Sequence, residues 1–504
     1  MTSEAGALRE YHERTKHSPT SVRSDPHFLD WDNQPRPFKV YADLEPIPLP
    51  TELPGSQMPA LQAITASDVA PPALGMLDLQ ALARLLYFSA GVLRHRTYSG
   101  GEIYFRAAAC TGALYHIDVY AVAADLPGLP AGVYQFAPHD FALRRLRDGD
   151  HRATLAAAAA NEAGIAVAPA VLVLTSTFWR NAWKYRSRTY RHCFWDAGTL
   201  LANLFAVAAS VHLPAHAVLG FEDAAVNALL GIDPAHEAAL VLLPLGSGAA
   251  PPAAAPAAPP LALDTLPLSA REVDHPLVRE AHAASSLASP AEVAAWRAQR
   301  DDTAPADVRG DVPLTPFPAA AVAQPIEAVI LRRGSSRRFP HAPIPRQALA
   351  TLVASATARV PMDVAVRSDV YVIVNAVEGM APGTYVAAPS GDAVQTLRAG
   401  DFRRTAGHLD LDQPLAADAA VNFYWLVDLE PVFRRLGERG YRAAQLAAAV
   451  GGGRVYLAAY ALGLGATGLT FYDDAVTAFF SPHAAGKAVM FLVAVGRRLP
   501  RSGN

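Results

Sequence analysis

Hydrophobic and polar positions follow two patterns along the chain, one typical of helices and one typical of strands. Between residues 77 and 93 apolar side chains recur at i, i+3 and i+4, which predicts an amphipathic helix. A long apolar stretch predicts a second helix over 196–210. Short apolar runs predict strands at 116–124, 132–138, 170–178 and 238–246. Helices and strands mixed within one unit indicate layered α+β domains.

The same unit occurs twice. Residues 132–152 and 383–403 align without a gap, with 10 identities in 21 positions and an offset of 251 residues. Upstream, Asp-Val-Tyr from Asp118 recurs from Asp369, and downstream FEDAAVNALL recurs as FYDDAVTAFF. Spacing kept this closely over about a hundred residues indicates duplication. Two copies, rather than a long array, predict domains that pack as an internal pseudo-dimer.

Composition divides the 504 residues into four segments. A Pro-rich lead is expected to run extended over a domain surface, and an Ala/Pro-rich linker with two short helices is expected between the copies. The predicted boundaries are 1–60 for the lead, 61–247 for copy one, 248–324 for the linker and 325–504 for copy two.

Charge and cysteine content exclude several function classes. A net charge of -3 gives no reason to expect a nucleic-acid partner. The longest apolar runs fall short of the roughly 20 residues that a membrane span requires, and the charged N-terminus has no signal-peptide core. Cys110 and Cys193 have no metal-ligand spacing, so we expect no metal site. We therefore expect a soluble, cytoplasmic protein.

Four blocks of sequence carry a family resemblance. They are YHERTKHS with DWDNQPRPFKVY, FRAAACTGALYHIDVY, RNAWKYRSRTYRHCFWDAGTLLANL, and LRRGSSRRF with GLGATGLTFYDD. In this order they resemble the nitroreductase-like flavoproteins, specifically the SagB/ThcOx-type dehydrogenases that include azoline oxidases. The resemblance covers nearly the whole chain. It implies tandem nitroreductase-like domains with FMN bound between them, each flavin touched by both, and it leaves a further homo-oligomer open.

Copy two resembles the family at its phosphate-binding motif. Arg333, Ser335 and Arg337 lie in a loop before a predicted helix, where two guanidiniums and a hydroxyl can surround a phosphate dianion. The alternative is a solvated basic run. Copy one aligns Ala66, Asp68 and Ala70 at these positions, so it has no such motif.

Copy one instead resembles the family at the turn that lies along the flavin ring. The turn comprises Cys110, Thr111, Gly112 and Leu114, and small residues let backbone donors approach the ring. Copy two reads PMDVAVRS here and has lost the turn. Two departures are Cys110, where the family usually has Ser, and His116, where it usually has Pro. Cys110 is a serine substitute or, alternatively, a nucleophilic or redox thiol.

Lys184 and Tyr185 resemble the Lys-Tyr pair implicated in catalysis by the azoline oxidases. Copy two has Arg435 and Leu436 at these positions. Their neighbours are shared by both copies and are therefore interpreted as structural: Arg188, Tyr190 and Arg191 recur as Arg439, Tyr441 and Arg442. The alternative for the pair is a surface lysine beside a core tyrosine.

Two further groups complete the implied flavin site. The loop expected along the flavin N5 edge comprises Gly465, Ala466, Thr467 and Gly468. Arg497 and Arg498 follow the last predicted strand, which ends at Gly496, and provide either another phosphate contact or a solvated pair.

Because each copy lacks what the other keeps, we expect one FMN per chain. The implied reaction is the dehydrogenation of a small-molecule or peptide substrate such as an azoline, with hydride passing to the flavin and a proton to Lys184 or Tyr185. Two alternatives remain open at this point. One is an NAD(P)H-dependent nitro- or quinone-reductase, and the other is a flavin-free docking subunit of a peptide-modifying complex.

Overall fold

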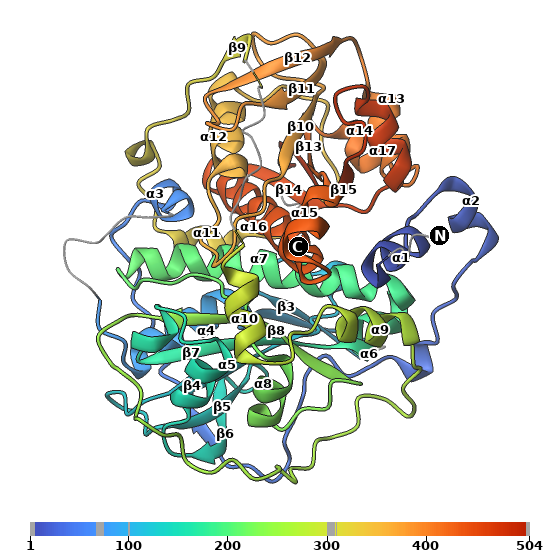
Figure 1. Ribbon diagram of the computed structural model, residues 1–504. Coiled ribbons are helices and arrows are strands. Elements are labelled where there is room, and N and C mark those ends of the chain that lie inside the picture. The colour runs from blue at the N-terminus through green and yellow to red at the C-terminus, as the bar shows by residue number, and fades with distance from the viewer. Residues whose placement is uncertain (1–5, 67–74, 99–100, 300–307, 309, 500–504) are drawn as a thin grey trace.

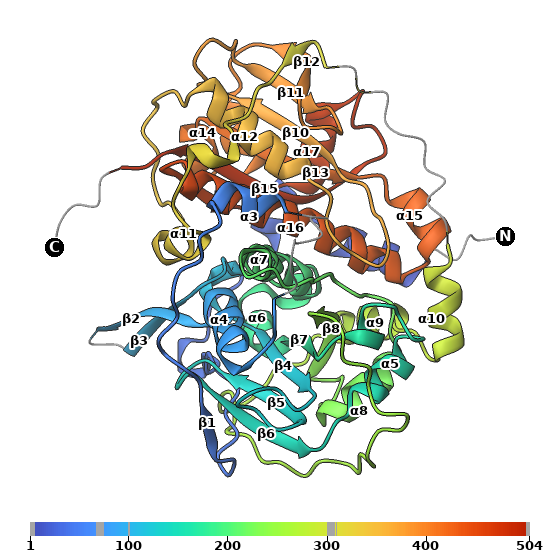
Figure 2. The ribbon, with the colours of Figure 1, turned by 90° about the vertical axis from the view of Figure 1, so that its left-hand side faces the viewer.

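The computed structural model describes residues 6–66, 75–98, 101–299, 308 and 310–499. Two α+β units lie one on the other, and two long helices cross between them (Figures 1 and 2). The tandem α+β arrangement predicted from the sequence is confirmed.

The first unit contains a six-stranded antiparallel sheet in the order β1-β6-β5-β4-β7-β8. Its strands are β1 (Pro46–Pro48), β4 (Ile117–Ala123), β5 (Gly132–Ala137), β6 (Ala142–Asp148), β7 (Ala170–Thr177) and β8 (Glu237–Leu245), with a separate hairpin of β2 (Val92–Tyr98) and β3 (Gly101–Arg106). Its helices are α3 (Ala60–Thr65), α4 (Leu79–Ala90), α5 (Arg152–Ala158), α6 (Phe178–Tyr185), α7 (Thr189–Ser210) and α8 (Asp223–Leu230).

The second unit contains a seven-stranded sheet in the order β14-β15-β13-β10-β11-β12-β9. Its strands are β9 (Val312–Pro313), β10 (Asp369–Val374), β11 (Gly383–Ala387), β12 (Ala393–Ala399), β13 (Val421–Val427), β14 (Leu464–Gly468) and β15 (Ala488–Arg497). Its helices are α11 (Ile326–Arg332), α12 (Arg346–Thr357), α13 (Arg403–Leu409), α14 (Pro414–Asp418), α15 (Leu429–Leu436), α16 (Arg439–Ala461) and α17 (Asp473–Phe480).

The duplication is visible in strand order and register. The order β6-β5-β4-β7-β8 corresponds to β12-β11-β10-β13-β15. Asp118 pairs with Thr175, and Asp369 pairs with Leu426, at the corresponding place. A shift of one residue would move every side chain to the opposite face of the sheet, so the shared register shows that both copies bury the same face.

The helices α7 and α16 form the centre of the pseudo-dimer. Both are almost wholly buried, so they carry apolar residues around most of their circumference. A Cβ atom on Gly198 would lie 2.5 Å from the Cβ of Ala449, and one on Gly453 would lie 2.5 Å from that of Ala202. Each glycine thus faces its own counterpart in the other copy. Small residues here allow the two helix backbones to approach closely.

Buried ion pairs join the copies on both sides of these helices. Arg188 and Arg191 of copy one donate to Asp473 of copy two at 3.1 and 2.6 Å. The second copy makes the reciprocal pairs: Arg439–Asp223 at 2.5 Å and Arg442–Asp223 at 2.8 Å. The prediction that these shared arginines are structural is confirmed.

The lead and the linker take part in the same pseudo-symmetry. The lead contains α1 (Ala7–Arg14) and α2 (Pro19–Ser24), and the linker contains α9 (Pro276–Ala284) and α10 (Pro290–Arg297). Arg191 donates to the carbonyl of His12 in α1, and Arg442 donates to the carbonyl of His282 in α9. Both α2 and α10 begin with a Ser cap followed by Pro. The duplicated unit therefore includes these helices, and what was predicted as a linker is in part the beginning of copy two.

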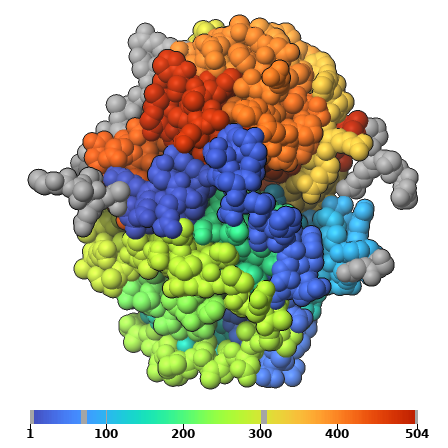
Figure 3. Space-filling model, turned by 90° about the vertical axis from the view of Figure 1, so that its right-hand side faces the viewer, coloured from blue at the N-terminus to red at the C-terminus, as the bar shows by residue number. Residues whose placement is uncertain are grey.

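Several boundaries differ from those predicted. The helix predicted over 77–93 ends at Ala90, because Gly91 is followed by strand β2. The long helix predicted from residue 196 begins at Thr189. The lead was expected to be extended, but it contains helices; it does lie across the boundary of the two units, as Figure 3 shows in blue.

By length and composition, the helical stretch Phe178–Ser210 could cross a membrane. However, 94% of its most apolar window is buried inside the protein. This burial is what a helix in the core of a folded domain shows.

Candidate functional site

A cavity of about 880 Å³ lies at the junction of the two units and is lined by both. This volume is in the range of small-molecule and cofactor sites. Most of the residues predicted as functional line it: Cys110, Thr111, Gly112, Lys184, Tyr185, Arg333, Ser335, Arg337, Thr467, Gly468 and Arg498.

Four predicted residues do not line the cavity. Leu114 is buried in an apolar cluster with Trp179 and Trp183, against which Tyr185 packs. Arg497 points away, donating to the carbonyl of Pro343 at 2.7 Å. The remaining two, Gly465 and Ala466, hold the loop behind the cavity wall: the Ala466 carbonyl accepts from the Ser336 amide at 2.9 Å, and the space beside Gly465 is filled by the Ser336 hydroxyl.

Arg333 joins the two copies at the cavity wall. It leaves the end of α11 and donates to the carbonyls of Ala107 and Arg106 in copy one at 2.8 and 3.2 Å. Its guanidinium also lies over the ring of Tyr456 at 5.9 Å. Two of its five N–H donors are therefore used to hold the loop against copy one, while the residue still lines the cavity.

Arg337 and Arg338 have the opposite character. Both are exposed and line the cavity, and neither forms a hydrogen bond or ion pair with any part of the chain that the structure describes. Ser335 is also exposed, 3.4 Å from the hydroxyl of Tyr456. Two unpaired guanidiniums beside a hydroxyl suit an anion.

The turn of copy one forms another part of the cavity wall. Gly112 has a φ of 63°, in the left-handed region that glycine adopts without strain. A Cβ at this position would lie 2.8 Å from the hydroxyl of Tyr185. Glycine is therefore required here both by its conformation and by the close approach of Tyr185.

Cys110 has the contacts of a hydrogen-bonding residue. Its thiol donates to Asp196 at 3.0 Å and accepts from the amide of Tyr115 at 3.0 Å. Burial, and then the carboxylate of Asp196, raise the pKa of the Cys110 thiol well above its usual value. A protonated thiol is a poor nucleophile, so the geometry favours the serine-like interpretation of Cys110 over the redox one.

Lys184 and Tyr185 have pKa values shifted in opposite directions. Burial and the nearby charge of Arg337 lower the pKa of Lys184. Burial, followed by Asp196 and Cys110, raises the pKa of Tyr185. The ammonium of Lys184 lies 5.3 Å from the centre of the Tyr185 ring, which packs edge-on against His192 at 4.6 Å. The pair therefore has the properties of a base beside a protonated donor.

The pseudo-symmetric place on the other side of the molecule is filled by the protein itself. Ala217 corresponds to Thr467 and Met362 to Thr111, yet Ala217 and Met362 form a β-bridge, whereas both threonines line the open cavity. Asp363 closes the gap further by accepting from the amides of Leu219 and Gly220, both at 2.9 Å.

Helix α10 covers this closed place. Arg297 donates to the carbonyls of Ala159 and Gly220 at 2.9 and 2.7 Å. Of the copy-one positions aligned with the phosphate motif, Ala66 directly follows α3, whereas Asp68 and Ala70 lie outside the described residues.

Sequence reasoning missed several lining residues. Among them are His17 from the lead and the loop that carries Leu411 and Gln413. Asp196, His192 and Trp195 of α7 also line the cavity, and they correspond to Ala447, Ala443 and Leu446 in α16. The comparison between copies that singled out Lys184 would have found these three as well. His17 belongs to the block YHERTKHS that carries the family resemblance, but nothing in the sequence placed it at the cavity.

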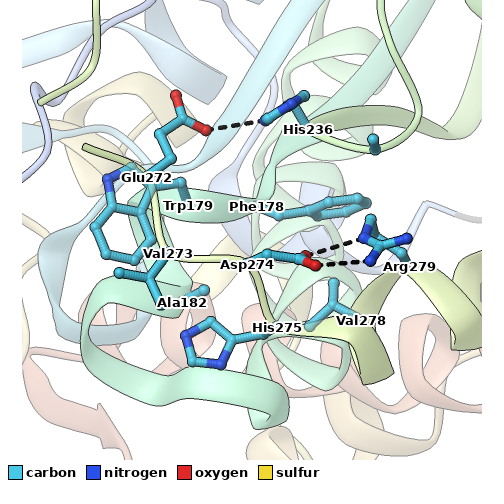
Figure 4. A pocket seen from close by; sticks show the side chains of 11 residues that line it. Phe178, Trp179, Ala182, His236, Glu272, Val273, Asp274, His275, Val278 and Arg279 are labelled. Atoms are coloured by element: carbon cyan, nitrogen blue, oxygen red, sulfur yellow. Dashed lines mark hydrogen bonds and ion pairs between the residues drawn. The ribbon is translucent and has the colours of Figure 1, made fainter.

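A second, smaller cavity of about 290 Å³ lies beside α6. Figure 4 shows its lining side chains, which come from α6 (Phe178, Trp179 and Ala182), from His236 and from residues between 272 and 279. Its polar groups largely pair with one another, as in Asp274–Arg279 at 2.6 Å. None of the predicted site residues lines it.

Comparison with known proteins decides the family. The nitroreductase family matches the chain twice, over residues 82–247 and 330–497. The chain belongs to the nitroreductase family. Each of its units is thus one nitroreductase domain, as the resemblance implied.

Individual relatives agree with this assignment. A protein of Methanocaldococcus jannaschii named as a nitroreductase is 29% identical over 170 residues, which cover 34% of this chain and 81% of that protein. A solved structure from Anabaena variabilis ATCC 29413, described as a nitroreductase, has a TM-score of 0.77 and 26% identity, covering 98% of this chain and 100% of its own. The tandem fold is therefore shared along its whole length.

A more distant structure is a chain of the E. coli microcin synthetase McbBCD complex with truncated pro-MccB17 bound. It has a TM-score of 0.31 and 18% identity, covering 48% of this chain and 91% of its own.

Proposed function

We propose that this nitroreductase-family protein is an FMN-dependent oxidoreductase of the SagB type, with one FMN per chain bound between its two units. The observation that carries the proposal is the pair of unequal interfaces. One interface encloses an 880 Å³ cavity lined by the residues that each copy alone retains. The other is closed by a β-bridge between Ala217 and Met362.

The residues around the cavity fit FMN. Arg337, Arg338 and Ser335 offer exposed donors to a phosphate. On the other wall, the exposed backbone at Gly112 allows a planar ring to approach closely. Trp195 and Phe491 add apolar surface to the wall. Bound FMN would supply the site with a two-electron hydride acceptor or donor.

Within this site, Lys184 and Tyr185 are suited to different tasks. The lowered pKa of Lys184 favours the neutral amine, which can accept a proton from a substrate. The raised pKa of Tyr185 keeps the phenol protonated, so it can orient a substrate heteroatom by donating to it. A base and a donor side by side suit removal of a proton from carbon while hydride leaves its neighbour. This supports dehydrogenation of a small-molecule or peptide substrate such as an azoline.

Family membership also supports a second function, an NAD(P)H-dependent nitro- or quinone-reductase. In that case the nicotinamide and the acceptor would bind one after the other in the part of the cavity beside Lys184 and Tyr185. For this reaction Lys184 would be dispensable as a base, because hydride transfer from NAD(P)H to a flavin requires no proton abstraction from carbon.

The decisive experiment is an absorption spectrum of the purified protein with a measured ratio of flavin to chain. A flavin spectrum with a ratio near one is expected. A ratio near two after full reconstitution would contradict the closed second site, and a colourless protein that cannot be reconstituted would favour the docking-subunit alternative. Dehydrogenation of an azoline-bearing peptide, compared with oxidation of NAD(P)H in the presence of menadione, then separates the two enzymatic functions.

A further inference from the structure

Asp196 is a buried carboxylate that lines the cavity from α7, with an exposed fraction of 5%. One of its oxygens accepts from the amide and the hydroxyl of Thr111 at 2.9 and 2.7 Å. The other accepts from the thiol of Cys110 at 3.0 Å and from the Nε2 of His116 at 2.8 Å. A single side chain thus ties the beginning of the turn to His116, which precedes strand β4.

His116 in turn leads away from the cavity. A carboxylate can only accept, so His116 donates from Nε2, and in the neutral ring its Nδ1 accepts from the hydroxyl of Ser176 at 2.8 Å. The thiol of Cys193 donates to the same hydroxyl at 3.3 Å. Donors therefore point one after another toward Asp196, an arrangement in which each bond strengthens the next. Ser176 is fully buried, so it is not an accessible nucleophile.

Every member of this chain of hydrogen bonds is confined to copy one. The counterparts of Asp196, His116 and Ser176 in copy two are Ala447, Arg367 and Val427. Cys110, Thr111 and Cys193 likewise correspond to Pro361, Met362 and Ala444. These residues are present at the open cavity and absent from the corresponding closed interface of copy two. The structural arginines, by contrast, are retained in both copies. Folding of the unit therefore does not require the hydrogen-bonded chain.

We propose that Asp196 is a positioning residue of the cavity: it holds the turn 110–113 in place through Thr111, and the buried His116–Ser176 pair holds Asp196. Its internal backbone bonds are the two from the amides of Ala113 and Leu114, and the Cys110 thiol adds contacts with the carbonyl of Thr111 at 3.7 Å and the amide of Tyr115 at 3.0 Å, so Asp196 provides the turn's side-chain link to α7. Without Asp196, the part of the cavity wall that the turn forms loses its fixed position. His116, unusual at this place in the resemblance, is then the residue that fixes the carboxylate.

The first test uses the protein without added flavin, so it is independent of the proposed function. Asp196→Ala reproduces the residue of copy two. It is expected to raise the amide hydrogen-exchange rates of residues 110–115 by about tenfold or more, because the Thr111 amide loses its acceptor. His116→Gln should have a smaller effect of the same kind. Residues 361–366 are the internal control, since they occupy the corresponding place and should exchange at unchanged rates.

Unchanged exchange at 110–115 in Asp196→Ala would overturn the proposal. If Asp196→Ala does not fold, a second variant replaces it. Thr111→Val removes only the hydroxyl bond to Asp196 and leaves the other hydrogen bonds of Asp196 and His116 intact. It is expected to speed exchange of the same residues severalfold, and no change would count against the proposal equally.

The second test rests on the proposed function. In the flavin-loaded protein, Asp196→Asn keeps the shape of the side chain but removes its charge. We expect FMN to bind roughly tenfold more weakly and its midpoint potential to rise, because a negative charge beside the cavity disfavours a reduced, electron-rich flavin. If Asp196 were only structural, Asp196→Asn would lower the melting temperature but leave the midpoint potential unchanged. That result would overturn the proposal that Asp196 positions the wall beside the flavin. Failure of wild type to bind FMN would instead refute the proposed function and leave the exchange test standing.

Discussion

Asp473 and Asp223 provide a matched pair of substitutions that separates stability from function. Asp473 is 3% exposed and accepts from Arg188, Arg191 and the amide of His17 at 3.1, 2.6 and 2.8 Å. Asp223 corresponds to it in copy one and makes the equivalent bonds to the arginines of copy two. Only the Asp473 cluster borders the cavity, through His17 and through Arg188, which lies 5.6 Å from the ring centre of Trp195.

The magnitude follows from what each substitution leaves behind. Asn in place of either aspartate keeps the shape but leaves two buried guanidiniums without a counter-charge. Breaking a buried pair in this way costs about 3–5 kcal/mol. We therefore expect Asp473→Asn and Asp223→Asn to lower the free energy of unfolding by similar amounts, measured by urea denaturation at pH 7.

The pH dependence gives a second check. Burial alone would raise the pKa of Asp473, but Arg188 and Arg191 lower it well below its usual range. A carboxylate with a depressed folded-state pKa stabilises the fold above its unfolded pKa of about 3.9, and that contribution is lost as the pH falls through the folded pKa. The difference between wild type and Asp473→Asn should therefore be largest near neutral pH and shrink below about pH 4.

Flavin binding should separate the two variants. Asp473→Asn is expected to weaken FMN binding as well as to lower stability, because it releases His17, which lines the cavity, and Arg188, which lies over the ring of the cavity-lining Trp195. Asp223→Asn should retain FMN affinity in conditions where both variants are folded. Equal losses of affinity in the two variants would refute the asymmetry of the interfaces, and a loss of stability below about 0.5 kcal/mol in both would refute the role of the ion pairs.

Three further predictions concern the cavity. Arg337→Ala should weaken FMN binding, measured by fluorescence titration, by roughly tenfold or more. Arg497→Ala, which removes a guanidinium outside the cavity, should not weaken it. Equal affinities of the two variants would contradict the assignment of Arg337 to the phosphate. For wild type, kcat/KM should rise with pH through the lowered pKa of Lys184, since the neutral amine is the base, and Lys184→Met should remove that limb; a limb that persists would assign it to another group. Tyr185→Phe should keep FMN and lower turnover by about 10²–10⁴-fold. Full activity of this variant would show that Tyr185 only packs in the core.

Much of the fold could be predicted from the sequence because duplication doubles every signal. Strand runs that recur at a constant offset predicted two sheets, and the structure shows the same order and register in both. The arginines around Tyr190 and Tyr441 were interpreted as structural because both copies retain them, and they form the ion pairs between the units. Hydrophobic periodicity is a local property, so it can be recognised in the sequence without knowledge of the tertiary structure.

The ends of helices, and which residues line the cavity, could be predicted less well from the sequence. The predicted helix over 77–93 ends early because Val92 pairs with Arg106 in a hairpin, and that partner is a matter of tertiary structure. Arg497 and Arg498 are equivalent in sequence, but strand β15 directs Arg497 away from the cavity, while Arg498 lines it.

By itself, the sequence determined that two copies of one unit exist and that each lacks residues the other keeps. Only the tertiary structure decided what those losses mean in space. It placed Ala217 against Met362 in one interface and left the corresponding threonines on the walls of a cavity in the other. It also brought His17 and Asp196 to that cavity from segments about 180 residues apart. Local patterns specify elements, but which elements meet depends on how buried surfaces and charges of distant segments fit together.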